Sequence, residues 1–117
     1  MKGDDIAERL LTFAAAVVTR VGMLPASTAG RHVGSQLVRS ATSAGANYEE
    51  ARSAESRADF IHKILLAAKE SRESRYWLDL ARRANLLDDD VEPLRREAGE
   101  LAAILAASAK TARATRV

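Results

Sequence analysis

Glu70 and Glu73 lie one helical turn apart, a spacing that general acid–base chemistry could use. Carboxylates act as proton donors and acceptors when a substrate lies within hydrogen-bond reach. These two, however, lie within one turn of a single helix and beside Trp77, a large side chain that fits a structural role. We therefore predict that Glu70 and Glu73 form buried ion pairs and do not act as a catalytic pair.

Motifs for metal binding and nucleophilic catalysis are missing from the sequence. A di-iron bundle needs two Glu-x-x-His pairs and two further glutamates, whereas this chain has one Asp59-x-x-His62 spacing and no Glu-x-x-His. His62, next to Lys63, is interpreted as a partly exposed surface histidine. The chain has no cysteine and no Gly-x-Ser-x-Gly, and Gly30-x-x-x-Gly34 lacks the Lys and Ser or Thr that complete a phosphate loop. We expect a protein that is not an enzyme and has no catalytic residue, metal ion or cofactor.

The composition indicates a helical domain of ordinary size. A chain of 117 residues can bury a real core without disulfides or metals. Only 4% of the residues are aromatic, while Ala, Leu, Glu and Arg abound, which favours helices over strands. The formal net charge of +2 does not by itself indicate nucleic-acid binding. No stretch of about 18 apolar residues could span a bilayer and no signal peptide is evident, so we expect a cytoplasmic protein with no membrane partner.

Four segments carry apolar residues at spacings of three and four, the pattern of amphipathic helices. We predict helices over residues 5–21, 28–53, 56–84 and 90–112. The core-facing positions are Ile6, Leu10, Phe13 and Val17 in the first segment; Val33, Leu37, Ala41, Ala44, Tyr48 and Ala51 in the second; Phe60, Ile64, Ala67, Ser71, Ser74, Leu78 and Ala81 in the third; and Val91, Leu94, Ala98, Leu101, Leu105 and Ser108 in the fourth.

Short connections between these helices force neighbours to run antiparallel. We therefore predict an all-α fold, an antiparallel up-down-up-down four-helix bundle in which residues 1–117 form a single domain. Ser27 or Thr28 is expected to cap the second helix. Gly30 and Gly34, near the start of that helix, are expected to permit close approach of another backbone.

The third helix carries a second stripe about 100° from its core-facing stripe. Trp77 and Leu80 add large apolar groups to this face, and exposed apolar patches on proteins mark partner surfaces. We predict that self-association into a homo-oligomer covers this face; the alternative is a single wide stripe that faces the core of the monomer. The second stripe consists of Leu66, Glu70, Glu73, Trp77, Leu80 and Ala84.

The second helix carries a polar stripe of small or amide side chains, which suit a solvent face poorly. Small residues let a neighbouring helix approach closely, and the polar groups then satisfy one another. We predict that Arg39 reaches Glu70 or Glu73, with Ser43 and Asn47 completing the network. Removing one member of a buried pair costs about 3 to 5 kcal/mol, so Arg39→Ala is expected to unfold or dissociate the protein. The polar stripe consists of Gln36, Arg39, Ser43, Asn47 and Glu50.

RSATSAGANYEEA (39–51) and DFIHKILLAAKESRESRYWLDL (59–80), followed by Glu100, Leu101, Ile104 and Leu105, resemble the four-helix-bundle proteins encoded by intervening sequences of bacterial 23S rRNA genes. These proteins are similar in turn to the accessory bundle protein of diversity-generating retroelements, which works beside a reverse transcriptase. The resemblance covers nearly the whole chain. It rests on Arg39, Ser40, Ser43, Asn47 and Glu50, and on Phe60, Lys63, Lys69, Glu70, Glu73, Tyr76, Trp77 and Leu78.

The resemblance implies an antiparallel bundle that assembles into a ring-shaped homopentamer and has no established enzymatic activity. It also implies nucleic acid, or a protein such as a reverse transcriptase, as a partner. The fourth helix departs from the family in its alanine-rich AAILAASA segment, which argues against a nucleic-acid surface on that helix.

Basic residues provide the candidate contacts to nucleic acid. In an oligomer each small positive patch is repeated, and attraction to phosphates grows with the number of contacts. Cations at the end of the last helix have an alternative role, because they complement the helix dipole. We predict a non-enzymatic, self-assembling bundle that binds the RNA or DNA backbone; the alternative is a protein–protein interaction scaffold. The candidate contacts are Lys63, Arg75, Lys110, Arg113 and Arg116.

Overall fold

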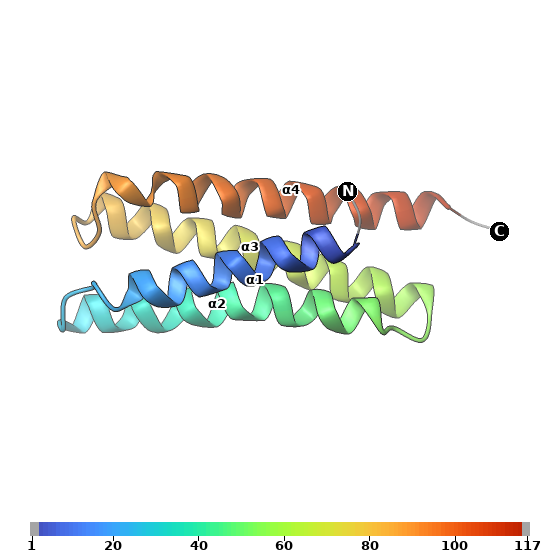
Figure 1. Ribbon diagram of the computed structural model, residues 1–117, viewed down its shortest axis with the longest axis horizontal. Coiled ribbons are helices and arrows are strands. Elements are labelled where there is room, and N and C mark those ends of the chain that lie inside the picture. The colour runs from blue at the N-terminus through green and yellow to red at the C-terminus, as the bar shows by residue number, and fades with distance from the viewer. Residues whose placement is uncertain (1–2, 116–117) are drawn as a thin grey trace.

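The computed structural model describes residues 3–115 and consists of four helices (Figure 1). The helices are α1 (Gly3–Val21), α2 (Thr28–Arg52), α3 (Arg57–Arg83) and α4 (Glu92–Ala114), and a short 3-10 turn, η1 (Asp89–Val91), precedes α4. No strand occurs within these residues. The all-α prediction is confirmed, and each helix boundary predicted from the sequence lies within two residues of the observed one.

The helices run antiparallel in sequence order around a common core, so α1 packs on α2 and α4, and α3 packs on the same two helices (Figure 1). The bundle measures 52 × 20 × 19 Å. Because α1 is the shortest helix, the turn between α2 and α3 lies beyond its first residues, and three helices build that end of the bundle. The up-down-up-down prediction is thereby confirmed.

The seam between α1 and α4 is the least extensive of the four helix contacts. Charged side chains span it. The Arg9 guanidinium binds Glu97 at 2.5 Å and Glu100 at 3.2 Å, and Arg20 pairs with Asp90. Partly exposed ion pairs therefore link α1 to α4 and to η1, whereas the core behind them is apolar.

Two serine side chains cap the N-termini of α2 and α3. Ser27 Oγ accepts a hydrogen bond from the Gly30 N–H at 3.0 Å, and Ser56 Oγ accepts one from the Asp59 N–H at 3.1 Å. Each satisfies an N–H group that has no partner within its own helix. Of the two caps proposed for α2, Ser27 is the one that forms.

Helix α3 ends in a left-handed residue, Asn85, with φ of 59°. The Leu86 N–H donates to the Ala81 carbonyl at 2.8 Å and the Asn85 N–H donates to the Arg82 carbonyl at 3.1 Å. This is the Schellman pattern, which satisfies the last carbonyl groups of a helix and reverses the chain. The reversal fixes how α4 lies against α3.

The core is built from the apolar stripes that the sequence predicts, and most of their members are buried. Phe60, Leu94 and Ser108 are partly exposed. The middle of α3 presents small residues, and Ser74 Oγ lies 2.8 Å from Ser40 Oγ of α2 in a fully buried hydrogen bond. Small side chains at this level let α2 and α3 approach closely.

Much of the second stripe of α3 packs inside the monomer. Glu70 is 9% exposed and Trp77 is partly buried against the core. Leu80 is 36% exposed and its neighbour Tyr76 is 59% exposed. Packing against α2 thus accounts for much of the stripe, because α2 covers its inner edge, while self-association stays a prediction for the remainder.

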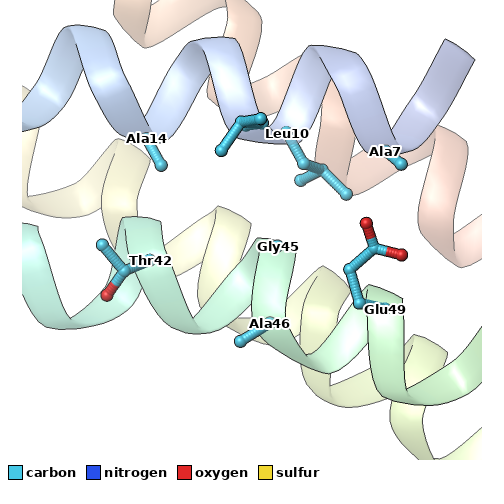
Figure 2. A pocket seen from close by; sticks show the side chains of 8 residues that line it. Ala7, Leu10, Ala14, Thr42, Gly45, Ala46 and Glu49 are labelled. Carbon is cyan, nitrogen blue, oxygen red and sulfur yellow. The ribbon is translucent and has the colours of Figure 1, made fainter.

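A shallow apolar groove separates α1 from α2 (Figure 2). A Cβ on Gly45 would lie 3.6 Å from the Leu10 Cβ, an ordinary contact distance, so the approach of α1 does not require glycine there. Leu11, which lines the groove, is 65% exposed, and Val18, about two turns further along α1, is 51% exposed. The groove is lined by Ala7, Leu10, Leu11, Ala14, Thr42, Gly45, Ala46 and Glu49.

Candidate interaction surfaces

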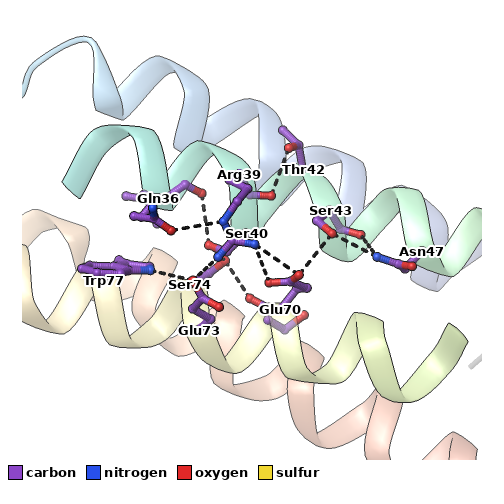
Figure 3. Close-up of polar contacts among 12 residues, drawn as sticks. Gln36, Arg39, Ser40, Thr42, Ser43, Asn47, Glu70, Glu73, Ser74 and Trp77 are labelled. Atoms are coloured by element: carbon purple, nitrogen blue, oxygen red, sulfur yellow. Dashed lines mark hydrogen bonds and ion pairs between the residues drawn. The ribbon is translucent and has the colours of Figure 1, made fainter. Parts of the chain in front are cut away.

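Arg39 of α2 joins two carboxylates of α3 (Figure 3). Its Nη1 donates to Glu70 Oε1 at 3.1 Å and to Glu70 Oε2 at 3.3 Å, and its Nη2 donates to Glu73 Oε2. Its Nε donates to Gln36 Oε1 at 3.1 Å. The contact predicted between Arg39 and the two glutamates is therefore present, and both carboxylates are used at once.

The remaining polar residues of α2 continue this network towards the turn between α2 and α3. Ser43 Oγ donates to Glu70 Oε2 at 3.4 Å, and Asn47 Nδ2 donates to Ser43 Oγ at 3.0 Å (Figure 3). Glu50, one turn further on, accepts from Lys63 Nζ at 2.6 Å. That hydrogen bond raises the pKa of the Lys63 ammonium, and it makes Lys63 a partner of Glu50, which weakens its case as a nucleic-acid contact.

Trp77 closes the other end of the network. Its Nε1–H donates to Glu73 Oε2 at 3.0 Å, and its ring packs edge-on against His32 of α2 and against Tyr76, with centroids 5.7 Å and 5.0 Å away. The hydrogen bond from Trp77, followed by the hydrogen bond and charge of Arg39, lowers the pKa of the Glu73 carboxyl, while partial burial opposes this shift. A hydrogen bond to a carboxylate favours its charged form. Glu73 therefore stays ionised through the neutral pH range.

The network is open to solvent on one side, which corrects the expectation of a buried pair. The side chain of Arg39 is 46% exposed, against 12% for Glu70 and 29% for Glu73. The helical period predicted which face Arg39 occupies, but the long side chain lies at the edge of the helix contact and keeps part of its guanidinium in water. The cost of 3 to 5 kcal/mol for a buried pair therefore does not apply to the monomer.

A second polar surface, which we name the basic groove, lies between α3 and α4. Arg75 stretches across it, and its Nη1 lies 3.2 Å from where a Cβ on Gly99 would be. The absence of a side chain at Gly99 thus leaves room for the guanidinium against α4. The basic groove is lined by Arg72, Arg75, Arg95, Arg96, Gly99, Glu100, Ala102, Ala103 and Ala106.

The arginines of the basic groove differ in their partners. Arg95 is held by Asp79 at 2.5 Å and by Glu92 at 3.4 Å, and Arg96 lies 3.8 Å from Glu92. Arg72 and Arg75 are exposed, and among residues 3–115 neither has a carboxylate within ion-pair distance. Their positive charge is therefore available to an anion from outside.

The other predicted nucleic-acid contacts lie at the end of α4. Lys110 is exposed, and Arg113 lies in the last turn of the helix. Arg116 lies outside the described residues. The structure thus places Arg75 in the basic groove and Lys63 in an ion pair elsewhere, so the predicted contacts do not form one cluster.

Sequence reasoning did not single out Arg72 and Arg96 as site residues. The signal for Arg96 is the spacing 96, 99, 103, 106, 110 on the fourth helix, which aligns Arg96, Gly99, Ala103, Ala106 and Lys110 along one line. The position of Arg72 and Arg75 opposite this line depends on the register of α3 against α4, which periodicity alone does not give.

Two further findings concern the described residues as a set. Within residues 3–115, no three His, Cys, Asp or Glu side chains gather where they could hold a metal ion. In the same part of the chain, none of the helices combines the length and the apolar character that crossing a membrane requires.

A family model and a solved structure point to the same protein family. The model of the 23S rRNA-intervening sequence protein family matches residues 5–107. A crystal structure of a protein of unknown function from the S23 ribosomal protein family of Bacteroides thetaiotaomicron is 34% identical in sequence and superimposes with a TM-score of 0.86. The match covers 94% of this chain and 99% of that chain. No curated protein matches this chain.

Proposed function

This chain belongs to the 23S rRNA-intervening sequence protein family, and from this premise we propose that it is a non-enzymatic, self-assembling bundle that binds the phosphate backbone of RNA or DNA. The observation that carries the proposal is the pair Arg72 and Arg75, exposed on α3 and without carboxylate partners in the described chain. Cations that neutralise phosphates release counterions, which drives binding without reference to sequence. We place this activity in the cytoplasm.

Backbone contact suits this surface better than base readout. The lining of the basic groove contains no aromatic side chain on which a base could stack, and its floor of glycine and alanine contains no hydrogen-bonding side chain. Arginine and lysine contacts to phosphate position a nucleic acid without reading its sequence. We therefore expect similar affinities for different sequences of one nucleic-acid type.

Self-assembly is supported by two exposed apolar patches on different sides of the bundle. One consists of Leu11 and Val18 on α1, and the other of Tyr76 and Leu80 on α3. A contact between two different patches is heterologous, and such contacts close into rings when the rotation allows it. A ring, with the pentamer implied by family resemblance as the expected size, would repeat Arg72 and Arg75 in every subunit.

The test is binding of the purified protein to duplex DNA and to structured RNA over a salt series, with the oligomeric state measured by light scattering in the same buffer. We expect an oligomer, and a logarithm of affinity that falls linearly with the logarithm of salt concentration, by about 0.9 per phosphate contact for a duplex. Absence of binding at low salt by an assembled oligomer would contradict the nucleic-acid proposal.

A protein–protein interaction scaffold is the second candidate function. The observation that favours it is the exposed apolar groove between α1 and α2, since contiguous apolar surface fits a protein partner. A reverse transcriptase is one partner that the family resemblance suggests. Capture of such a partner by a protein that fails to bind nucleic acid at low salt would favour this function over the first.

A further inference from the structure

We propose that the basic groove between α3 and α4 binds one sugar–phosphate strand, with Arg72 and Arg75 on one wall and Arg96 on the other. This inference rests on the proposed function and names the site that performs it. It also revises the expectation that the alanine-rich fourth helix argues against a nucleic-acid surface there.

The small residues of α4 form the floor on which a strand can lie. Gly99, Ala103 and Ala106 follow one another along the line of the groove, and the two alanines are exposed. Without long side chains between the walls, phosphate oxygens can approach the arginines of α3 directly. The alanine-rich segment thus removes obstacles, while α3 supplies most of the charge.

The carboxylates around the groove are each paired with an arginine other than Arg72 and Arg75. Asp79 binds Arg95, Glu92 lies near Arg95 and Arg96, and Glu100 binds Arg9 of α1. Arg72, Arg75 and Lys110 have no ion pair of this kind among residues 3–115. The groove lining contains four arginines and one glutamate, so its formal charge is positive, which complements a polyanion and not a neutral or apolar ligand.

The length of the groove suits a run of phosphates. The line from Arg96 to Ala106 covers 10 residue steps, or about 15 Å at 1.5 Å per step. One strand of B-form DNA rises about 3.4 Å per phosphate, so roughly four phosphates fit beside this line. Guanidinium groups bind phosphate oxygens in pairs of parallel hydrogen bonds, so the arginines on both walls can each hold a phosphate.

A protein segment fits this groove less well than a strand. Protein partners bind through buried anchors such as Trp, Tyr and Leu that fill pockets, whereas a floor of glycine and alanine between charged walls has no deep apolar pocket. We therefore assign the groove to nucleic acid and leave an acidic polypeptide as an outcome of the test.

The central variant is Ala103→Glu, which puts a carboxylate on the floor, keeps every arginine and uses an exposed helical position. Its matched control is Ala29→Glu, the same change at an exposed alanine in the first turn of α2, where a carboxylate suits the helix dipole. With labelled duplex DNA and hairpin RNA at low salt, we expect at least a tenfold loss of affinity for Ala103→Glu. The control should stay within about twofold of the wild type.

Two further variants separate charge from shape. Ala103→Gln adds similar bulk without charge and should lose less affinity than Ala103→Glu. The double variant Arg72→Ala with Arg75→Ala should lower the slope of log affinity against log salt by about 0.9 per arginine on duplex DNA. Replacing both arginines with lysine, which keeps the charge, should restore most of that slope.

The outcomes separate the two proposals. A wild-type oligomer that binds no nucleic acid at low salt overturns the proposed function. Wild-type binding that Ala103→Glu and the double arginine variant leave unchanged overturns the groove and leaves the function standing. If polyglutamate binds more tightly than either nucleic acid, and Ala103→Glu abolishes that binding, the groove belongs to an acidic protein and the inference is wrong.

Discussion

Arg39 connects two helices while nearly half of its side chain remains in water. The contribution of Arg39 to stability depends on which groups would lose their partner if its side chain were removed. An exposed ion pair contributes less than about 1 kcal/mol, but Glu70 is buried, and a buried polar group without its partner costs about 1 to 3 kcal/mol.

We therefore expect Arg39→Ala to lower the free energy of unfolding by roughly 1 to 2 kcal/mol, measured by urea denaturation. Arg39→Lys, which keeps the charge but not the forked contact with Glu70 and Glu73, should lose less. A loss of 3 to 5 kcal/mol would instead indicate that a second copy of the chain buries this pair.

Trp77 sets the ionisation of Glu73 through the hydrogen bond from its indole. Trp77→Phe should raise the pKa of the Glu73 carboxyl towards its ordinary value, as measured by NMR titration of a carboxyl-labelled protein. A lowered folded-state pKa stabilises the protein above the unfolded-state pKa, and this contribution disappears as the pH falls through the folded-state pKa. The variant should therefore lose stability at neutral pH, and its difference from the wild type should narrow in acid. A difference that does not change with pH would contradict this role.

Helix α2 begins against the backbone of the preceding turn. A Cβ on Gly30 would lie 2.0 Å from the Pro25 carbonyl oxygen, so Gly30→Ala forces the turn between α1 and α2 to move. At Gly45, where a Cβ meets Leu10 only at ordinary contact distance, alanine gains helix propensity.

We expect Gly30→Ala to lower the melting temperature and Gly45→Ala to raise it, the latter through a gain of about 0.5 to 1 kcal/mol. Thermal unfolding followed by circular dichroism measures both. Equal changes in melting temperature at the two glycines would show that contact with Pro25 does not destabilise the Gly30→Ala variant.

Much of the helical architecture could be predicted from the sequence because it repeats. The stripe through Leu10 and Leu37 and the cap at Ser27 are local or periodic signals. The exposed fraction of the Arg39 side chain and the position of Arg75 over Gly99 could not be predicted, since both depend on the register of one helix against another. That register is fixed by packing and by the turn at Asn85, and no single segment of the sequence encodes it.

At the scale of the molecule, the apolar patch of Leu11 and Val18 belongs to α1, whereas the basic groove lies between α3 and α4. The other patch, Tyr76 and Leu80, lies on α3 itself, and Tyr76 is about 40° from Arg72 around that helix. Contact through the α1 patch therefore leaves the basic groove accessible. Assembly and nucleic-acid binding are thus compatible in one small bundle.

We expect Leu11→Gln with Val18→Gln to reduce the oligomer mass measured by light scattering, because both exposed side chains belong to one apolar patch. The fold should persist, since neither side chain is in the core. Met23→Gln is the matched control, an equally exposed apolar residue outside both patches. A mass unchanged by the double variant would place the contact elsewhere.

The contact between α1 and α4 differs from the other three helix contacts, because it is the least extensive and is linked by ion pairs. Ions screen exposed charge pairs and leave apolar contacts intact, so added salt weakens the contacts of Arg9 and Arg20 first. Amide hydrogen exchange at moderate salt should then reveal an opening in which α1 separates from α4 while remaining attached to α2. In this open state α1 would remain attached to the bundle through α2 alone. The first helix is therefore where a partner protein could begin to unfold the bundle.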